Sequence, residues 1–444
     1  MPVHTGTMPA LVNFNTSSHD QAAVEAKANW RVCAVVLLLF VVAATLSAIR
    51  KDVTFGFDEV AHASYVAHLQ HTGETWPAFG DMRMLDPSSF GFTGEANYLD
   101  HPSPYYVLLA RMGPTLEGHP EAILFYRLFN VALVAIGLAA LMAIGLVAKL
   151  PRLTLYAYIV PIAGIPLLAP LAGAINNDNA GFVGGAIATL AMLQLLSTGS
   201  RAWLMAALGG VILASWAKFT ALLLVGGLVG GVLLWLLWQR RLPSRWVGLI
   251  AIAALLAAAP YVALFVQYGS PTPRTPGQIA MIKSGALAVG WDSAERMTPA
   301  SYAAHFVSEF VEEWMPTLKQ RNALNYAVLA IPVTAALCAF GGFLVAVQRI
   351  AHEKAGPLDI VVAAGMLAFA GTLLIHGIFG YELHTEFGWQ ATAYPRYYLP
   401  LAAIVPLAGL ALLGAIKTLS ARAILLVFLI AGPLAFRLLG APLG

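Results

Sequence analysis

The stretch AWLMAALGGVILASWAKFTALLLVGGLVGGVLLWLLW, residues 202–238, decides the fold, because it contains a single charged residue, Lys218. As one helix it would be about 55 Å long, at about 1.5 Å per residue, whereas the hydrocarbon core of a bilayer is about 30 Å thick. Two short spans, 202–217 and 221–238, with Lys218 at the turn between them, fit that thickness. The stretch therefore predicts a polytopic membrane protein.

The overall composition supports this class. The 444 residues are 59% hydrophobic and 11% charged, whereas about a quarter of the residues of a soluble domain are charged. The mean hydropathy is +0.75. A formal net charge of +3 indicates no basic surface of the kind that binds nucleic acid. The two cysteines, Cys33 and Cys338, lie in apolar stretches and indicate no disulfide framework.

Apolar runs long enough to cross a bilayer recur along the chain. We therefore expect an all-α, polytopic membrane protein of about eleven transmembrane helices. The expected organisation is a cytoplasmic N-terminal tail, 1–29, and a single transmembrane domain, 30–444, with extracytoplasmic loops at about 50–121 and 267–321. The expected spans are at roughly 30–49, 122–148, 153–173, 181–198, 202–217, 221–238, 246–266, 323–347, 358–379, 398–416 and 421–439.

The distribution of charge predicts the orientation. With eleven spans, five short connections fall on the side of the N-terminus, and they hold ten Lys or Arg residues and one acid, Glu353. The positive-inside rule makes that side cytoplasmic. If 202–238 were one span, Arg240, Arg241 and Arg245 would lie outside, against the rule. Most of the 22 acids fall on the other side, so polar chemistry is expected there. The Ala- and Gly-rich spans favour a bacterial inner membrane.

The first extracytoplasmic loop opens with a dense group of polar residues, FDEVAHASYVAH at 57–68. Apolar residues recur in it at near-helical spacing, which predicts an amphipathic helix along the membrane interface. Asp58 and His62 are four residues apart and share a face of that helix. Asp58 is either a plain helix N-cap or a chemical group. The pair is also a weak candidate metal site, since it lacks a third ligand.

A second polar group follows in the same loop, EANYLDHPSPYYVLLA at 95–110. Pro104 begins a helix well, and the run 104–112 is too short to span a bilayer, so a second interfacial helix is expected. The plain alternatives are turn chemistry at His101-Pro102 and an aromatic belt at the headgroups for the tyrosines that follow.

Together these stretches resemble the GT-C superfamily, multispanning glycosyltransferases that take a sugar from a polyprenyl-phosphate carrier and include the protein O-mannosyltransferases and the lipid A aminoarabinose transferases. The resemblance covers about 50–400. Residues 394–400, YPRYYLP, are similar to the Gly-Arg-Tyr-x-x-Pro motif of one bacterial branch, with Pro395 in place of the glycine. The other motifs are Asp58-Glu59, His101-Pro102-Ser103-Pro104-Tyr105-Tyr106, Arg127 with Asn130, Asn176-Asn177-Asp178-Asn179 and Lys218-Phe219-Thr220.

The resemblance implies an inverting glycosyltransferase that moves a sugar from a polyprenyl-phosphate-linked donor to an extracytoplasmic saccharide, lipid or protein acceptor. It places the catalytic acidic residue at Asp58, and Glu59 is left open as the base instead. Adjacent helical carboxylates point about 100° apart, so one of the two is expected to face the cavity. A partly desolvated carboxylate has a raised pKa and works as a base.

Cations beside the donor phosphate would stabilise the charge that develops on it. The candidates are Arg396, Lys218 and Arg127, with Tyr397 next to them. The plain alternatives are snorkelling to the headgroups for Arg396 and Lys218 and pairing with a loop acid for Arg127. No metal site and no other cofactor is predicted, and a divalent cation is left open. Polar residues of second rank, for orienting the base, binding sugar hydroxyls or completing a metal site, are His62, Glu95, His101, Asp178 and Tyr105.

Residues 302–314 predict a further amphipathic helix, since Tyr302, Phe306, Phe310 and Trp314 recur every four residues. This helix either covers the acceptor or packs on the bundle. Two other functions stay open: a transporter or flippase of lipid-linked saccharides, and an assembly subunit without activity. A transporter is expected to place polar groups near the bilayer midplane, whereas here they concentrate at one interface. The expected partners are the lipid-linked donor, its acceptor and membrane lipid.

Overall fold

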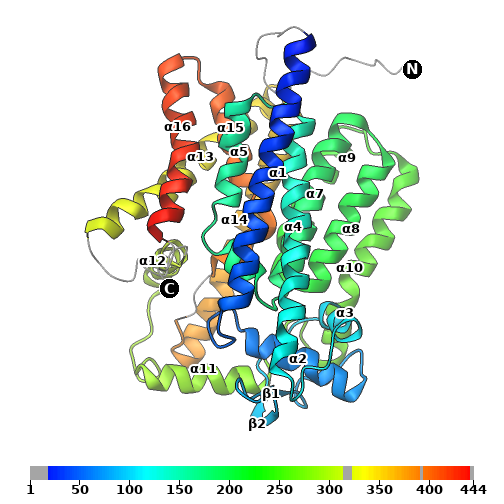
Figure 1. Ribbon diagram of the computed structural model, residues 1–444, viewed down its shortest axis with the longest axis vertical. Coiled ribbons are helices and arrows are strands. Elements are labelled where there is room, and N and C mark those ends of the chain that lie inside the picture. Colours follow the sequence, from blue (N-terminus) through cyan, green and yellow to red (C-terminus); the bar gives the residue numbers. More distant parts are fainter. Residues whose placement is uncertain (1–18, 314–322, 391–393, 441–444) are drawn as a thin grey trace.

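The structure is a computed structural model that describes residues 19–313, 323–390 and 394–440. In this part nearly all of the regular secondary structure is helical, and most of the long helices run roughly along one axis of the molecule (Figure 1). The expected all-α class is confirmed. The elements are α1 (His19–Arg50), α2 (Glu59–Thr72), β1 (Arg83–Leu85), β2 (Phe92–Ala96), α3 (Pro104–Met112), η1 (Pro120–Ala122), α4 (Ile123–Val147), α5 (Arg152–Ala163), α6 (Leu168–Ala172), α7 (Asp178–Thr198), α8 (Arg201–Ala217), α9 (Phe219–Trp238), η2 (Ser244–Trp246), α10 (Val247–Tyr268), α11 (Pro276–Ala288), α12 (Pro299–Glu312), α13 (Ala323–Ala351), α14 (Pro357–Phe387), η4 (Pro395–Leu401), α15 (Ile404–Ala415) and α16 (Leu419–Gly440).

Within the described residues, eight helices are long and apolar enough to cross a membrane by themselves. The pair η4 and α15, bent by 58° where the two helices meet, brings the number to nine if it is counted as one broken span. The two remaining expected spans are shorter: α8 is a single short apolar helix, and the segment 153–173 is divided into α5 and α6. Helices therefore occupy all eleven expected segments, although not each of them has full spanning length.

The outer surface of the bundle is apolar along its helices. Leu38 of α1 is 62% exposed, Leu255 of α10 is 71% exposed and Leu367 of α14 is 62% exposed. A soluble monomer rarely exposes large apolar patches to water. This surface suits the hydrocarbon of a bilayer, as expected of a polytopic membrane protein.

The long apolar stretch is interrupted at Lys218. Helix α8 ends at Ala217 and α9 begins at Phe219, and Lys218 between them is extended, with φ −163° and ψ 147°. Its N–H still donates to the carbonyl of Ala214 at 3.0 Å, and its carbonyl accepts from the N–H of Leu222 at 3.0 Å. The predicted division into two helices is confirmed, and Lys218 lies at the junction between the end of α8 and the start of α9.

Helix α7 lies at the centre of the bundle, in contact with α4, α8, α9 and η4. Small residues allow two of these contacts. A Cβ atom at Gly184 would lie 2.6 Å from the carbonyl oxygen of Gly210 in α8, and one at Gly185 would lie 1.9 Å from the carbonyl oxygen of Pro400 in η4. Glycines let backbones approach closely in membrane bundles. They hold the segments that carry Lys218 and Arg396 against α7.

The segment 51–121 folds into a layer at one end of the bundle. Figure 1 shows α2, α3, the β1–β2 hairpin and α11 at the lower end, away from the N-terminus. Both expected helices are present, α3 beginning at Pro104. The expected amphipathic character of the first one is wrong, because α2 packs against both α3 and β1 and residues 61–69 are all buried. The antiparallel hairpin pairs Leu85 with Phe92 and was not predicted.

Helix α12 confirms the helix expected near 302–314. Tyr302 and Phe306 are buried on one face, and the ring of Phe310 lies 5.1 Å from that of Tyr398. The helix therefore packs on α14 and η4 through the predicted aromatic face. Trp314 lies outside the described residues.

Candidate functional site

The site begins with an unusual backbone turn before α2. Gly56, Phe57 and Asp58 have φ angles of 74°, 61° and 56° in succession. Left-handed conformations are costly for residues other than glycine, and strained backbone of this kind is concentrated at functional sites. Asp58 is the N-cap residue of α2, but its side chain makes no capping hydrogen bond. Its carboxylate is therefore turned to other partners.

Four charged side chains from four distant segments meet beside this turn. The Nη2 of Arg396 donates to Oδ2 of Asp58. The Nε of Arg396 lies 3.5 Å from Oδ2 of Asp178, and the Nζ of Lys218 lies 3.1 Å from Oδ1 of Asp178. We call Asp58, Asp178, Lys218 and Arg396 the four-charge cluster. Two cations and two carboxylates make its formal charge zero.

The members of the four-charge cluster differ in their access to solvent. The side chain of Asp58 keeps 39% of its exposure, whereas that of Asp178 keeps 3%. Lys218 and Arg396 are nearly buried as well. Asp58 is therefore the most accessible member of the cluster, and the two cations and Asp178 are more deeply buried.

Aromatic rings line the cations. The Nζ of Lys218 lies 3.4 Å from the ring centroid of Tyr397. The guanidinium carbon of Arg396 lies 5.3 Å from the ring of Tyr397, 5.1 Å from that of Tyr394 and 5.8 Å from that of Phe57. Ring faces attract cations at these distances. The rings thus orient both cations without neutralising their charge.

The turn 176–179 before α7 holds this part of the site together. The N–H of Asp178 donates to Oδ1 of Asn176 at 2.8 Å. Asn176 also donates to the carbonyl of Phe57 at 2.8 Å, so it ties the strained turn to α7. Asn177 donates to the carbonyl of Ala217 at 2.7 Å, directly before Lys218. The predicted Asn- and Asp-rich turn is therefore the link between Asp58, Asp178 and Lys218.

Glu59 and Arg127 are engaged with each other beside the four-charge cluster. Arg127 donates from Nε to Oε1 of Glu59 at 2.8 Å and from Nη2 to Oε2 at 2.7 Å. Lys51 also donates to Glu59, and the N–H of Ile175 reaches its Oε1 at 3.0 Å. The Nη1 of Arg127 donates to the carbonyls of Ala48 and Lys51. The side chain of Glu59 is fully buried, so the contacts of this pair are structural. Of the two interpretations of Arg127, the structure agrees with the plain one, in which it pairs with an acidic residue of the loop.

His62, four residues after Asp58, is buried, and both of its ring nitrogens have hydrogen-bond partners. Its Nδ1 lies 2.8 Å from the hydroxyl of Tyr106, and its Nε2 lies 3.0 Å from Nδ2 of Asn176. The amide nitrogen donates, so Nε2 accepts and His62 is neutral. Burial, His101 and the nearby cations hold the pKa of His62 well below its ordinary value. Neither nitrogen is free for a metal ion.

The other residues of second rank lie at different distances from the cluster. The ring of His101 stacks on that of His62 with centroids 6.0 Å apart, and its Nδ1 lies 3.3 Å from Asp100. The hydroxyl of Tyr105 donates to Asn130 at 2.8 Å inside the bundle. Glu95 is exposed on β2 and is not brought to the four-charge cluster by any contact within the described residues.

The expectation of a raised pKa at Asp58 is wrong. Burial acts to raise the pKa of this carboxyl, but the positive charges of Arg396 and Lys218 and the hydrogen bond from Arg396 outweigh it. The pKa of Asp58 therefore lies below its ordinary value. The carboxylate is ionised at neutral pH, and Arg396 holds it.

The sequence did not single out Tyr98 or Tyr394. The hydroxyl of Tyr98 donates to Oδ1 of Asp58 at 3.1 Å. Tyr98 precedes the residue pair Asp100-His101 within the second polar stretch, and Tyr394 is adjacent to the Pro-Arg-Tyr motif. Their place inside those stretches was the available signal, but no spacing rule connects Tyr98 to a residue 40 positions earlier.

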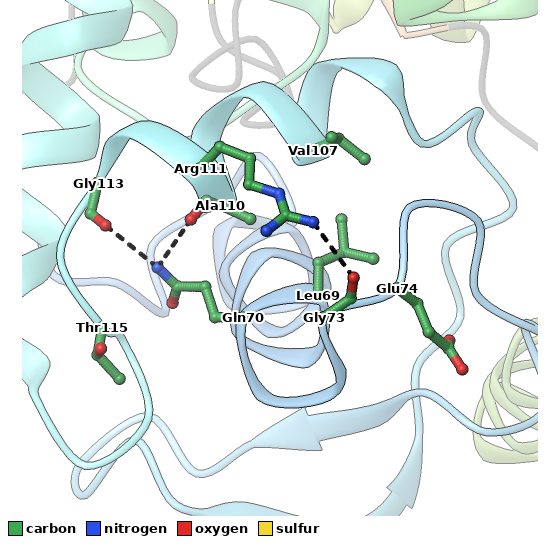
Figure 2. A pocket seen from close by; sticks show the side chains of 9 residues that line it. All are labelled: Leu69, Gln70, Gly73, Glu74, Val107, Ala110, Arg111, Gly113 and Thr115. Atoms are coloured by element: carbon green, nitrogen blue, oxygen red, sulfur yellow. Dashed lines mark hydrogen bonds between the residues drawn. The ribbon is translucent and has the colours of Figure 1, made fainter.

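The far end of α2 is anchored by polar contacts around a cavity of about 240 Å³, shown in Figure 2. Gln70 donates to the carbonyl of Pro114 at 2.9 Å and accepts from the N–H of Leu116 at 3.1 Å. Arg111 donates to the carbonyl of Gly73 at 3.3 Å. These contacts fix the C-terminal end of α2, which lies about 20 Å from Asp58 because the helix has 14 residues.

No group of three or more His, Cys, Asp or Glu side chains in the described part of the chain is placed to hold a metal ion. The arrangement can nevertheless bind a phosphate, because Arg and Lys side chains pair well with phosphate oxygens. The accessible carboxylate of Asp58 beside those cations can accept a proton.

Comparison with known proteins finds similarity to solved structures. No family model matches the chain, and no curated protein matches it. The crystal structure of ArnT from Cupriavidus metallidurans bound to undecaprenyl phosphate is 14% identical and covers 91% of this chain and 85% of its own, with a TM-score of 0.35. The apo structure of the same protein is 15% identical and covers 88% and 78%, with a TM-score of 0.35.

Proposed function

We propose that this chain is a membrane glycosyltransferase that moves a sugar from a polyprenyl-phosphate-linked donor to an extracytoplasmic acceptor, with inversion and with Asp58 as the general base. The observation that carries the proposal is the four-charge cluster. It joins an accessible carboxylate and two aromatic-lined cations at the end of the bundle opposite the basic connections. These are the groups that the reaction needs: a proton acceptor and partners for a phosphate.

Arg396 and Lys218 bind the donor phosphate in this proposal. Both side chains are already desolvated, so their attraction for a phosphate is stronger than it would be in water. The Nε of Arg396 has no hydrogen-bond acceptor within the described residues, which leaves a donor for a phosphate oxygen. Arg127 has no part in phosphate binding here, because its donors are directed to Glu59 and to backbone carbonyls.

Binding of the phosphate prepares the base. The four-charge cluster is neutral, so a phosphate that pairs with Arg396 competes with Asp58 for that cation. As Arg396 turns to the phosphate, Asp58 loses the charge that lowers its pKa, and burial then raises the pKa. The carboxylate thus becomes a stronger base only when the donor is in place.

The transfer itself is a single displacement. The acceptor hydroxyl oxygen forms a bond to the anomeric carbon while the bond from that carbon to the phosphate oxygen breaks. The hydroxyl proton goes to Asp58, and the electron pair of the broken bond stays on the polyprenyl phosphate. Arg396 and Lys218 stabilise the charge on that leaving group. Attack opposite the leaving phosphate inverts the anomeric carbon.

The test compares Asp58→Asn with wild type. Each purified protein is reconstituted with radiolabelled polyprenyl-phosphate sugars and an acceptor extract from a strain that lacks the gene. We expect wild type to transfer label and Asp58→Asn to lose at least about 100-fold of the rate, since a general base contributes about 10²–10⁴-fold. Asp52→Asn is the matched control, because Asp52 is in the same loop and, among the described residues, its side chain is hydrogen-bonded only to Thr54.

The possible outcomes separate the functions. Equal transfer by Asp58→Asn and wild type would show that the base lies elsewhere. If neither protein transferred label while the lipid-linked sugar still crossed the bilayer, the chain would be a transporter of lipid-linked saccharides.

A further inference from the structure

A second cavity lies at the other end of α7 from the four-charge cluster. Asp178 is the first residue of this 21-residue helix, so its last turn is about 30 Å away. The cavity has a volume of about 200 Å³ and lies where the ends of α7 and α9 meet the starts of α10 and α14. It is lined by Leu195, Leu196, Gly199, Trp235, Leu236, Arg241, Trp246, Ala355, Pro357 and Ile360.

One of the residues that line the cavity, Trp246, carries a buried hydrogen-bond donor without an acceptor. Trp246 is 5% exposed and lines the cavity, and its indole Nε1 has no partner within the described residues. A buried N–H group without an acceptor costs about 1–3 kcal/mol. A ligand oxygen that accepts a hydrogen bond from this N–H would recover that free energy.

The charge at the cavity is positive. Arg241 is the charged residue among the lining side chains, and Arg240 and Arg245 lie in the same connection. None of these three arginines forms an ion pair with another described residue. Of the acids close in sequence to the lining residues 355–360, Asp359 pairs with Arg349 and Glu353 is exposed. The cavity therefore favours an anion.

The residues in and around the cavity suit a lipid ligand. Its walls are mostly leucine, isoleucine and tryptophan, and the last turns of α9 continue onto an exposed apolar surface, with Leu234 66% exposed and Leu237 57% exposed. An amphiphile with an anionic head and apolar chains matches both parts. A free inorganic anion would use only Arg241 and Trp246.

We propose that this cavity binds the headgroup of an anionic phospholipid from the leaflet opposite the four-charge cluster. Arg241 pairs with the phosphate, the Nε1–H of Trp246 donates to a headgroup oxygen, and the acyl chains lie along α9. Basic pockets between membrane helices are suited to such lipids. The site is independent of the proposed transfer reaction.

The test is native mass spectrometry of the full chain in detergent, titrated with phosphatidylglycerol and with phosphatidylcholine of the same acyl chains. We expect one phosphatidylglycerol molecule to bind at least about fivefold more tightly than phosphatidylcholine, since one Lys or Arg near the membrane surface contributes about 1 kcal/mol. Arg241→Gln should remove that preference. Trp246→Phe keeps an aromatic side chain of smaller size, removes the N–H donor and should weaken phosphatidylglycerol binding.

Arg245→Gln is the matched control, because it removes the same charge from the same connection without touching the lining. Equal loss in Arg241→Gln and Arg245→Gln would reduce the effect to general surface attraction and overturn the site. Equal binding of the two lipids by wild type would also overturn it. So would displacement of phosphatidylglycerol by millimolar inorganic phosphate, since the site would then take a free anion.

Discussion

At the scale of single residues, the two neighbouring carboxylates of the acidic pair have different surroundings. The side chain of Glu59 is fully buried between Arg127 and Lys51, whereas the side chain of Asp58 keeps 39% of its exposure. A buried carboxylate with two cations and a backbone N–H on its oxygens has no free acceptor position for a substrate proton. The contacts therefore favour Asp58 as the chemical member and Glu59 as the structural one.

This difference predicts unequal losses of stability from two similar substitutions. Glu59→Gln leaves Arg127 and Lys51 buried without a counter-charge, so we expect a loss of roughly 3–5 kcal/mol of stability. Asp58→Asn should cost less, because the side chain of Asp58 is 39% exposed and Arg396 keeps Asp178 beside it. Thermal unfolding in detergent measures both. In the double variant Glu59→Gln, Arg127→Leu, part of the loss should be recovered, because one unpaired cation is gone. Equal melting temperatures for the two single variants would contradict the assignment.

The pH dependence of transfer tests the hold of Arg396 on Asp58. In the free protein the pKa of Asp58 is lowered, so the acid limb of kcat/KM in wild type should lie below the ordinary range for a carboxyl. Arg396→Gln removes the nearest positive charge, burial then dominates, and the limb should move up by about one to three pH units. The pH profile of Arg396→Gln is measured from its remaining rate of sugar transfer, in the steady state or before it.

Arg274→Gln is the control for this shift, because Arg274 pairs with Glu386, away from the cluster. The wild-type limb of kcat, which reports the donor complex, should lie at higher pH than that of kcat/KM. Coincident limbs would contradict the exchange of Arg396 from Asp58 to the phosphate.

At the scale of elements, the sequence predicts what depends on local composition. Long apolar runs located the helices, and the length limit of a bilayer located the break at Lys218. The burial of α2 could not be predicted, because it depends on α3 and the β1–β2 hairpin, which cover it from later in the chain. The hairpin strands have three and five residues, too few for a clear period of two.

The same limit applies to the site. Local motifs drew attention to Asp58, Asp178, Lys218 and Arg396, but not to the pairs they form. The pairing of Glu59 with Arg127 spans 68 positions, and that of Asp58 with Arg396 spans 338. Such pairs depend on the packing of α4, α7 and η4, which a pattern in a single segment does not contain.

The contact of α7 with α8 gives a prediction at this scale. A Cβ at Gly210 would lie 2.5 Å from the carbonyl oxygen of Gly184, whereas a Cβ at Gly209 would meet nothing within 4 Å. Gly210→Val should therefore force the helices apart and cost about 1–3 kcal/mol, with Lys218 drawn away from Asp178. Gly209→Val should be mild. Melting temperatures and transfer rates of the two variants provide the comparison, and equal effects would contradict the close contact.

At the scale of the whole molecule, the chain has two chemically different ends. The short connections at the end where α1 begins are basic, and α2, α3 and the hairpin occupy the other end (Figure 1). The four-charge cluster lies at that other end too, because Asp58 directly precedes α2. The proposed transfer to an acceptor would take place at the end with the cluster, and the proposed binding of anionic lipid would take place at the basic end.

The positive-inside rule then predicts which end faces the cytoplasm. In a variant with both native cysteines replaced by alanine, His119→Cys places a thiol at the exposed end that carries the cluster, and Thr418→Cys places one between α15 and α16 at the basic end. A membrane-impermeant maleimide added to intact spheroplasts should label His119→Cys and not Thr418→Cys, and both should react after permeabilisation. The reverse pattern would place the four-charge cluster in the cytoplasm. It would then remove the case for an extracytoplasmic acceptor, even if Asp58 and Arg396 still transferred a sugar, because the acceptor reaches the cluster only from the side on which Asp58 is exposed.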